Sequence, residues 1–457
     1  MAGERRGMRP RVPDAEMEYT ARARLALIAR RAREEPRCQF TSLAHLLDES
    51  FLAECYLSLG RNRASGLDGV TWEEYGENLV ANLKGLVARL KAKRYKPQPV
   101  RRTYIPKDEH SVRPLGMPSL EDKIVQKGMV TILEAIYEAD FLDCSYGFRR
   151  QRSCHQALNA VDKLIMTKPI NHVVDADIKG FFDNVSPEWM LRFLQVRIKD
   201  PSFLLLIRRF LKAGYVEAGR LVMTERGTPQ GGNLSPILSN VYLHYVLDLW
   251  FEKKFKRQLE GQSYLIRYGD DFVALVQKGT EARYIRQVLE RRFAQFDLEL
   301  HPEKTVVLSF GRYERENARR QNRRAHTFDF LGFTHYCGVS RRGNFMVVRR
   351  TSRKKFRRKC RELNMWLKTI RNTVKTKDWW PVLGTKLRGH YQYYGVSGNM
   401  ASLKRFYAVA LRLAYKWLNR RSQRQTFCWK GFREYVKHYP LPEPRITCNL
   451  YTLSPVS

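Results

Sequence analysis

The sequence lacks any long uninterrupted apolar run. Its longest such run, residues 203–207, has the size of a core segment and is far shorter than the roughly 20 residues that a membrane-spanning helix needs. The N-terminus begins Met1-Ala2-Gly3-Glu4-Arg5-Arg6 and has no apolar stretch of the secretory type. We therefore expect an intracellular, cytoplasmic protein that does not enter a membrane.

The sequence also lacks a Cys-x-x-Cys pair. Eight scattered cysteines without close spacing argue against a zinc ribbon and against a disulfide framework. Because free cysteine is usually interior, we expect buried thiols. The eight positions are Cys38, Cys55, Cys144, Cys154, Cys337, Cys360, Cys428 and Cys448.

Acidic residues are scarce relative to basic ones. The chain has 46 Asp and Glu against 83 Lys and Arg, which gives a formal net charge of +37. Such an excess indicates a polyanionic partner. Nucleic acid is favoured over a membrane surface because Tyr, Trp and Phe are interleaved with the basic residues and offer stacking surfaces. With 457 residues and a hydrophobic fraction of 43%, the chain is long enough to fold into more than one domain.

Helical and extended patterns alternate along the chain. This mixture predicts an α+β fold with a sheet covered by helices on one face. Residues 341–361 hold eleven Arg or Lys and no Asp or Glu, so we expect a basic helical module at the end. We predict an N-terminal helical extension at 1–60, a main body at 61–338 and the basic module at 339–457. Apolar periodicity predicts helices at 16–35, 43–59, 71–86, 119–137, 352–371 and 399–420, and strands at 100–106, 112–118, 172–178 and in a hairpin over 264–276.

Three carboxylates lie at positions where a negative charge is energetically unfavourable. Asp177 ends an apolar strand, and Asp270 and Asp271 lie together in the turn of the predicted hairpin. A divalent cation would neutralise them. Three carboxylates on one sheet suit a two-metal site for phosphoryl transfer. The alternative is that Asp270 and Asp271 form only a polar turn, where Asp is common.

These segments resemble the motifs of group II intron reverse transcriptases, in the same order along the chain. The resemblance covers roughly residues 40 to 457. It rests on residues 65–71 (SGLDGVT), 145–149 (SYGFR) with 153–155 (SCH), 177–183 (DIKGFFD), 227–236 (GTPQGGNLSP), 268–271 (YGDD), 300–305 (LHPEKT) and 330–333 (FLGF).

The resemblance implies roles for individual residues. Asp177, Asp270 and Asp271 would bind two Mg²⁺ ions, or Mn²⁺, as the catalytic carboxylates. Lys107 and Arg113 would bind the triphosphate of the incoming dNTP, Phe182 would exclude a ribose 2′-hydroxyl, and Gln230 would lie near the nascent base pair. The alternatives are a solvated charge for Lys107 and Arg113 and core packing for Phe182.

The resemblance also implies a right-hand polymerase architecture, with fingers and palm at 61–338 and a helical thumb or maturase domain at 339–457. Residues 387–395 (LRGHYQYYG) carry the likeness in the thumb. Basic helices would grip an RNA template paired with a DNA or RNA primer by its phosphates. The alternative is a solvated basic face. The candidate residues are Arg353, Lys354, Lys355, Arg357 and Arg358.

The implied function is RNA-directed DNA synthesis, which extends a primer 3′-hydroxyl with dNTPs. A splicing cofactor that binds a structured intron RNA is a second hypothesis, and an RNA polymerase is a third. Gly269 stands where the family usually has Ala and favours the third, whereas Phe182 argues against it. The sequence ends at Ser457 without the Cys-containing endonuclease module of many mobile intron proteins. We therefore expect an endonuclease-less intron protein, or a free-standing relative in DNA repair or phage defence. The pattern predicts no oligomeric state.

Overall fold

The computed structural model of the chain describes residues 15–106, 112–223, 227, 231–421 and 426–450. The chain divides into two compact units that interleave along the sequence. Unit 1 comprises Met1–Arg150, Asp177–Arg257 and Val288–His301, and unit 2 comprises Gln151–Ala176, Gln258–Gln287 and Pro302–Ser457. Across the described residues, every helix is too short or too polar to cross a membrane. The predicted division at residues 60 and 338 stays a prediction.

Unit 1 is built around helix α5 (Leu120–Tyr137). The hydroxyl of Ser119 caps this helix by accepting from the Asp122 backbone N–H at 3.2 Å. Its side chains are buried on nearly every face, because α1, α2 and α10 all pack on it. The other helical segments of the unit are α1 (Ala15–Glu34), η1 (Ala44–Leu46), α2 (Glu49–Leu57), α3 (Trp72–Glu77), α4 (Leu79–Lys91), α7 (Phe181–Asn184), α8 (Pro187–Leu194), α9 (Pro201–Leu211), α10 (Ser235–Leu243), η2 (His244–Asp248) and η3 (Trp250–Lys254), followed by η4 (Phe255–Gln258) at its boundary.

A four-stranded sheet accompanies these helices in unit 1. Strands β1 (Val100–Pro106) and β2 (Val112–Met117) form an antiparallel hairpin, and β4 (Tyr215–Glu217) joins β1 in parallel. Strand β5 (Arg220–Val222) completes the order β2-β1-β4-β5. The two segments predicted as extended therefore pair as a hairpin, as expected from the sequence.

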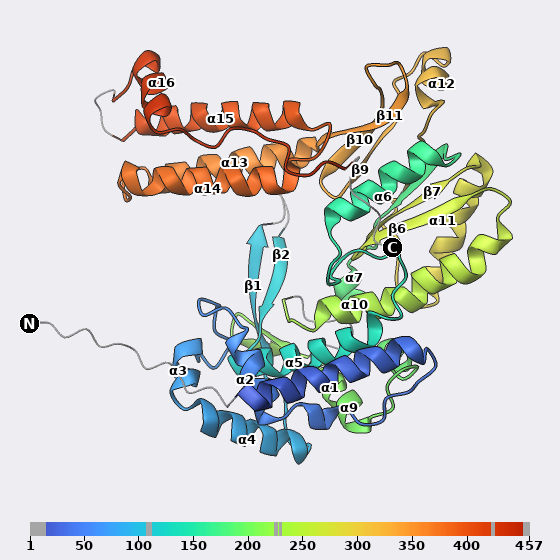
Figure 1. The fold of residues 1–457 in the computed structure, drawn as a ribbon, viewed down its shortest axis with the longest axis vertical. Helices are drawn as coiled ribbons and strands as arrows, with labels where there is room; N and C mark the ends of the chain where they lie inside the picture. The colour runs from blue at the N-terminus through green and yellow to red at the C-terminus, as the bar shows by residue number, and fades with distance from the viewer. Residues whose placement is uncertain (1–14, 107–111, 224–226, 228–230, 422–425, 451–457) are drawn as a thin grey trace, which may run out of the picture. The chain divides into compact units, whose positions relative to one another are not determined.

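Unit 2 contains an antiparallel sheet with the order β6-β7-β3-β8, shown in Figure 1. Helix α6 (Cys154–Thr167) contacts β6 and β7, so it covers one face of this sheet. The strands are β3 (His172–Ala176), β6 (Ser263–Tyr268), β7 (Asp271–Val276) and β8 (Val306–Ser309), and α11 (Gly279–Ala294) follows β7. Val173, Val174 and Ala274 are buried in its centre.

A second sheet leads into the C-terminal helices of unit 2. Its order is β11-β10-β9, and Figure 1 shows α13, α14 and α15 side by side beyond it. Trp379, Leu383 and Leu403 are buried in this part of the chain. The elements are α12 (Glu314–Arg320), β9 (Thr327–Phe330), β10 (Phe333–Val339), β11 (Phe345–Thr351), α13 (Arg353–Ile370), α14 (Thr376–Tyr394), α15 (Met400–Leu418) and α16 (Trp429–His438).

The mixed helix and sheet fold is confirmed, but two predicted helices are each divided in the structure. The helix predicted at 71–86 is interrupted at Asn78, which ends α3 and precedes α4. Residues 43–59 form the short η1 and the separate α2. The break occurs at Asp48, whose carboxylate accepts from the Phe51 backbone N–H at 2.9 Å and begins a new helix. Among the described residues, the α-helices outside the predicted set are α6, α7, α8, α9, α10, α11, α12, α14 and α16. Pro381 lies inside α14, and its low helix propensity hides the pattern.

The cysteines are only partly as predicted. Cys38, Cys55, Cys144 and Cys337 are buried, and burial raises the pKa of the Cys55 thiol to about 12. Cys154, Cys360 and Cys448 are half-buried. Cys428 is exposed, which contradicts the prediction for that position. Its sulfur accepts from the Gly431 backbone N–H at 3.4 Å at the start of α16, a capping role that needs a position at the helix end.

Candidate functional site

The turn that carries two of the candidate carboxylates is tight, and its backbone conformation favours glycine. Tyr268 and Asp271 are the last ladder pair of the β6–β7 hairpin, so Gly269 and Asp270 form the turn itself. Gly269 has φ +68, a conformation that costs a residue with a Cβ. The departure from the family's usual Ala therefore suits this backbone.

A buried cation supports this turn from inside. Arg267 has no exposed surface, and its guanidinium donates to the Gly269 carbonyl at 3.0 Å. A buried guanidinium thus holds the backbone of the turn that carries the two carboxylates. Sequence reasoning missed Arg267, although a lone Arg in an apolar strand was the signal.

The third candidate carboxylate is tied to the same ladder through the chain. Asp177 directly follows Ala176, the last residue of β3, and Ala176 is paired with Phe272, which directly follows Asp271. Asp177 and Asp271 are therefore each one residue away from the same ladder pair. Within unit 1, the Asp177 carbonyl accepts from the His301 backbone N–H at 2.8 Å. The segment after β3 is thus held by the predicted 300–305 motif.

Gly227, the first residue of the glycine-rich motif, contacts the segment of Phe182 within unit 1. Gly227 has φ +88, and a Cβ there would lie 2.7 Å from the Phe182 carbonyl oxygen. Its N–H donates to the Val185 carbonyl at 2.8 Å. Phe182 is half-buried and makes an edge contact with the buried Phe181, with ring centroids 5.4 Å apart. Gly227 therefore packs directly on α7, the short helix that carries Phe182.

The remaining predicted nucleotide residues are only partly described. Arg113 is exposed on β2 and is paired with Ile105. Lys107 and Gln230 lie outside the described residues. Beside Gln230, Gly231 has φ +111, and a Cβ there would meet the Gly116 carbonyl oxygen at 2.3 Å. Its small size lets this block approach the end of β2.

A cavity of about 660 Å³ opens beside the catalytic turn within unit 2. We call it the basic cavity. Tyr268 and Asp271 border it from the hairpin, Leu331 and Gly332 from the turn after β9, and Phe406 from α15. Its other lining residues come from α13 and α14: Lys355, Arg358, Lys359, Glu362, Leu363, Trp366, Lys386, Gly389, His390, Tyr393 and Tyr394.

Cations dominate the charge of the basic cavity. Four basic side chains and two carboxylates line it, and one carboxylate, Glu362, pairs with Arg358 at 3.3 Å and with Lys359 at 2.8 Å. The imidazole of His390 stacks on Phe406 at 3.8 Å. Burial first, and then nearby Lys359, lowers the pKa of His390 to about 4, so it is neutral at pH 7. The cavity thus combines positive charge with aromatic faces, the two features that hold nucleic acid.

The helical positions of the cations decide which ones face the cavity. Of the five thumb residues predicted from the sequence, Lys355 and Arg358 line it, whereas Arg353, Lys354 and Arg357 do not. Sequence reasoning missed Lys359 and Lys386. Lys355, Arg358, Lys359, Glu362 and Trp366 recur at helical spacing, which was the available signal.

The donor types fit a hard divalent cation, because carboxylate oxygens are the ligands that Mg²⁺ prefers. Asp270 and Asp271 come from unit 2 and Asp177 comes from unit 1. Asp271 is exposed, and the other two are half-buried. Among the described residues, no group of three or more His, Cys, Asp or Glu side chains is gathered as a metal site.

Similarity to known proteins covers the region that holds these motifs. The family described as "Reverse transcriptase (RNA-dependent DNA polymerase)" matches residues 105–335. The "Group II intron-encoded protein LtrA" of Lactococcus lactis subsp. cremoris is 39% identical over 240 residues, which cover 51% of this chain and 39% of that protein. "Protein YkfC" of Escherichia coli (strain K12) is 33% identical over 315 residues, which cover 60% of this chain and 81% of that protein. "Nuclear intron maturase 4, mitochondrial" of Arabidopsis thaliana is 28% identical over 137 residues, or 28% of this chain and 16% of that protein.

Proposed function

The chain belongs to the reverse transcriptase family, in the group II intron type, and from this premise we propose that it extends a primer with dNTPs on an RNA template. One observation carries the proposal. Asp271, next to the glycine turn, opens onto a cavity lined by four cations and several aromatic rings. A carboxylate at the edge of a phosphate-binding cavity is the arrangement that nucleotidyl transfer needs.

Asp177, Asp270 and Asp271 are the residues that would hold two Mg²⁺ ions. When bound, such ions lower the pKa of an attacking hydroxyl and stabilise charge on the transferring phosphate. In the reaction, a bond forms between the primer 3′-oxygen and the α-phosphorus of the dNTP. The bond between the α-phosphorus and the oxygen that bridges to the β-phosphate breaks, pyrophosphate leaves with that oxygen, and the hydroxyl proton passes to water.

The basic cavity would position the primer strand. Lys355, Lys359 and Lys386 would contact its phosphates, and rings such as Tyr268 and Trp366 would pack against its sugars and bases. This holds the 3′-hydroxyl near the carboxylates without reading the sequence. The direct test is incorporation of dTTP on a poly(rA)/oligo(dT) duplex by the purified full chain. Absence of any incorporation above a no-enzyme control, with the duplex bound, would refute polymerase function.

A prediction about sugar selection follows from the place of Phe182. Phe182→Val should raise the kcat/KM for rNTP relative to dNTP by at least about tenfold, or about 1.4 kcal/mol of differential transition-state binding. The half-buried ring would occupy the space that a 2′-hydroxyl needs, so shrinking it admits ribonucleotides. Single-nucleotide incorporation of ATP and dATP on one template measures this ratio.

The buried neighbour of Phe182 is a matched control for the sugar test. Phe181→Leu changes a ring that is only 2% exposed, so it should alter stability and leave the sugar preference unchanged. An unchanged ratio in Phe182→Val would make Phe182 part of the core. Equal use of ATP and dATP by the wild type would favour the RNA polymerase hypothesis.

A prediction about salt dependence separates the two sets of cations on and near α13. Replacing Lys355, Lys359 and Lys386 with glutamine should reduce the slope of log K against log[salt] for a template–primer duplex by about two to three, at about 0.7–0.9 per phosphate contact. Fluorescence anisotropy over a range of salt concentrations gives the slope. Replacing Arg353, Lys354 and Arg357 with glutamine removes the same charge outside the cavity lining and should change the slope less. Equal losses in the two triple variants would contradict a specific role for the basic cavity.

A role in intron splicing is a second proposed function. It is favoured by the names of relatives, which include an intron-encoded protein and an intron maturase, and by the net charge of +37. RNA binding and polymerisation would then use different groups. A variant without catalytic carboxylates that still promotes splicing of a group II intron transcript would establish it, and a wild type with no effect on splicing would refute it.

A further inference from the structure

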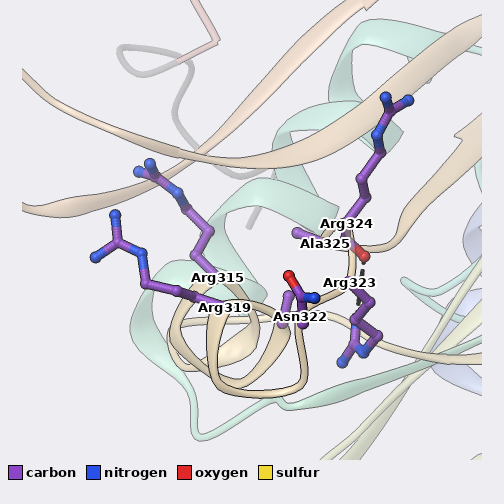
Figure 2. Close-up of a pocket in the computed structure, with 7 residues that line it drawn as sticks. Arg315, Arg319, Asn322, Arg323, Arg324 and Ala325 are labelled. Atoms are coloured by element: carbon purple, nitrogen blue, oxygen red, sulfur yellow. Dashed lines mark hydrogen bonds between the residues drawn. The ribbon is translucent and has the colours of Figure 1, made fainter.

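A second cationic site lies on unit 2, where no predicted motif falls. A hollow of about 500 Å³ is lined by Arg315, Ala318, Arg319, Asn322, Arg323, Arg324 and Ala325, and we call it the arginine hollow. Figure 2 shows the side chains of Arg315 and Arg319 extending side by side from α12 and that of Arg324 rising from the segment after this helix. Four arginines and no acidic residue therefore surround one space.

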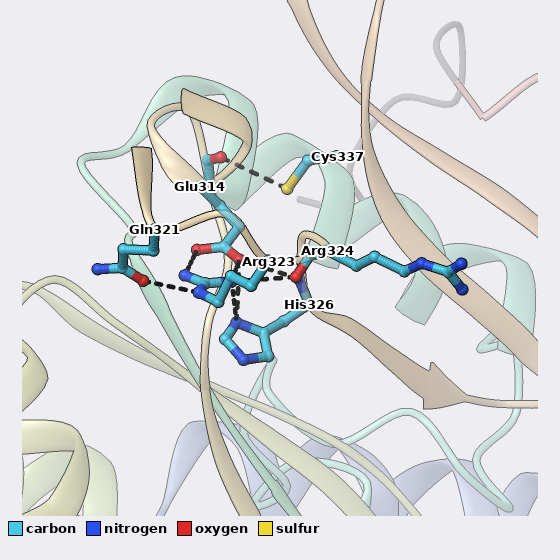
Figure 3. A network of polar contacts seen from close by, with 7 residues as sticks. Glu314, Gln321, Arg323, Arg324, His326 and Cys337 are labelled. Atoms are coloured by element: carbon cyan, nitrogen blue, oxygen red, sulfur yellow. Dashed lines mark hydrogen bonds and ion pairs between the residues drawn. The ribbon is translucent and has the colours of Figure 1, made fainter. Parts of the chain in front are cut away.

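A buried carboxylate fixes the shape of this segment, as Figure 3 shows. The side chain of Glu314 is 1% exposed, and it accepts from the Arg323 guanidinium at 2.6 and 3.1 Å. It also accepts from the His326 backbone N–H at 2.9 Å. Burial opposes ionisation of Glu314, but these hydrogen bonds outweigh it and lower its pKa. These hydrogen bonds join the two ends of the arginine-rich segment. The segment's own contacts therefore hold the hollow in shape.

The other arginines of the hollow have no counter-charge. Arg323 is occupied by Glu314, and Glu316 pairs with Arg320, which does not line the hollow. Within the described part of the chain, Arg315, Arg319 and Arg324 form no ion pair. Like charges at positions i and i+4, such as Arg315 and Arg319, repel each other and disfavour the helix. An anionic ligand would relieve this repulsion.

The lining identifies the class of anion. Guanidinium groups bind phosphate oxygens through paired hydrogen bonds. The hollow has no aromatic lining and only Ala318 and Ala325 as apolar residues, so it offers no aromatic ring on which a base could stack. Single strands and free nucleotides usually need such a surface. Helical nucleic acid, which presents rows of phosphates with its bases turned inward, needs none.

The arginine hollow is distinct from the basic cavity. The hollow ends at Ala325, shortly before β9 begins, whereas the basic cavity includes Leu331 directly after β9 ends. Six residues of extended chain span about 20 Å, and the two sites share no residue. We propose that the arginine hollow binds the phosphate backbone of a helical nucleic acid segment other than the template–primer duplex held at the basic cavity. The site would let the protein hold a structured RNA while it copies another region.

Two double variants with the same charge change test the proposal. Arg315→Gln/Arg319→Gln removes two lining arginines, and Arg312→Gln/Arg320→Gln removes two flanking ones that do not line the hollow. Binding of a 20-base-pair RNA hairpin and of a DNA hairpin of the same sequence is measured by anisotropy over a salt range, with primer extension on a short oligonucleotide duplex in parallel. The lining variant should bind the RNA hairpin on the order of tenfold more weakly, with a slope reduced by about two, at about 0.9 per phosphate contact. Its primer extension should stay within about twofold of the wild type.

Three outcomes would overturn the proposal. Equal weakening in both double variants would mean that only overall charge matters, and no weakening in either would remove the hollow from any binding surface. A parallel loss of primer extension in the lining variant would assign the hollow to the template–primer duplex. The two hairpins distinguish the sources, since equal losses for both indicate recognition of helical phosphates in general and a loss for one hairpin alone identifies that polymer. Because the readout is binding, the result does not depend on whether the wild type polymerises DNA.

Discussion

Asp270→Asn/Asp271→Asn should lower the rate of dNTP incorporation by at least about 10³-fold, which corresponds to about 4 kcal/mol of transition-state stabilisation. Asparagine keeps the size of each side chain but removes the charge that would hold a divalent cation. Gly269 and the buried Arg267 would still form the turn, so the hairpin should fold. Single-turnover incorporation of dTTP on a poly(rA)/oligo(dT) duplex measures the loss.

The same variant should bind the duplex as tightly as the wild type, or slightly more tightly. Asp271 borders a cavity whose cations would contact phosphates, so removing its negative charge removes a repulsion. Asp378→Asn, an exposed carboxylate in the first turn of α14, serves as the control and should keep full activity. A double variant that retained activity within tenfold of the wild type would exclude these carboxylates from catalysis.

Asp162→Ala should destabilise unit 2 by about 3–5 kcal/mol, because it leaves a buried charge without its partner. The Asp162 carboxylate on α6 accepts a hydrogen bond from Arg349 on β11, and the two side chains are 4% and 0% exposed. Burial raises the pKa of Asp162 to about 6 even though Arg349 opposes the shift. His335 does not supply a second positive charge for Asp162, because burial, followed by Arg349, lowers the pKa of His335 to about 3.

A double replacement separates the ion pair from simple packing. Asp162→Ala/Arg349→Met removes both charges and should recover most of the lost stability, because an apolar side chain then fills the site. Urea unfolding followed by circular dichroism gives the free energies of unfolding. A single variant that lost less than about 1 kcal/mol, or a double variant no more stable than the single one, would contradict a stabilising role for this ion pair between α6 and β11.

Much of the fold could be predicted because its signals are local. The capping box at Thr71 and Glu74 is present, with the Thr71 backbone N–H donating to Glu74 at 2.8 Å, and the strands at 100–106 and 172–176 form as expected. These features depend on neighbours within four residues. The helix at 43–59 failed for the same reason, since a local cap at Asp48 outweighed the apolar period.

The candidate site could be predicted only in part. The carboxylates Asp177, Asp270 and Asp271 and the order of the motifs were visible in the sequence, and the family match covers residues 105–335, which contain all three carboxylates. The binding roles of these residues stay predictions. Which thumb cations face the cavity was not visible, because charge alone does not reveal which side of α13 is covered.

The sequence by itself determined the family, the mixed fold and the excess of positive charge. Motif order, the helical and strand spacings of apolar residues, and composition are all properties of the linear chain. Only the tertiary structure decided the contacts between distant residues. It joined Asp162 to Arg349 across 187 positions and placed Gly227 on the backbone of Phe182. The physical reason is that such contacts depend on how whole elements pack, and a pattern of nearest neighbours carries no record of which faces meet.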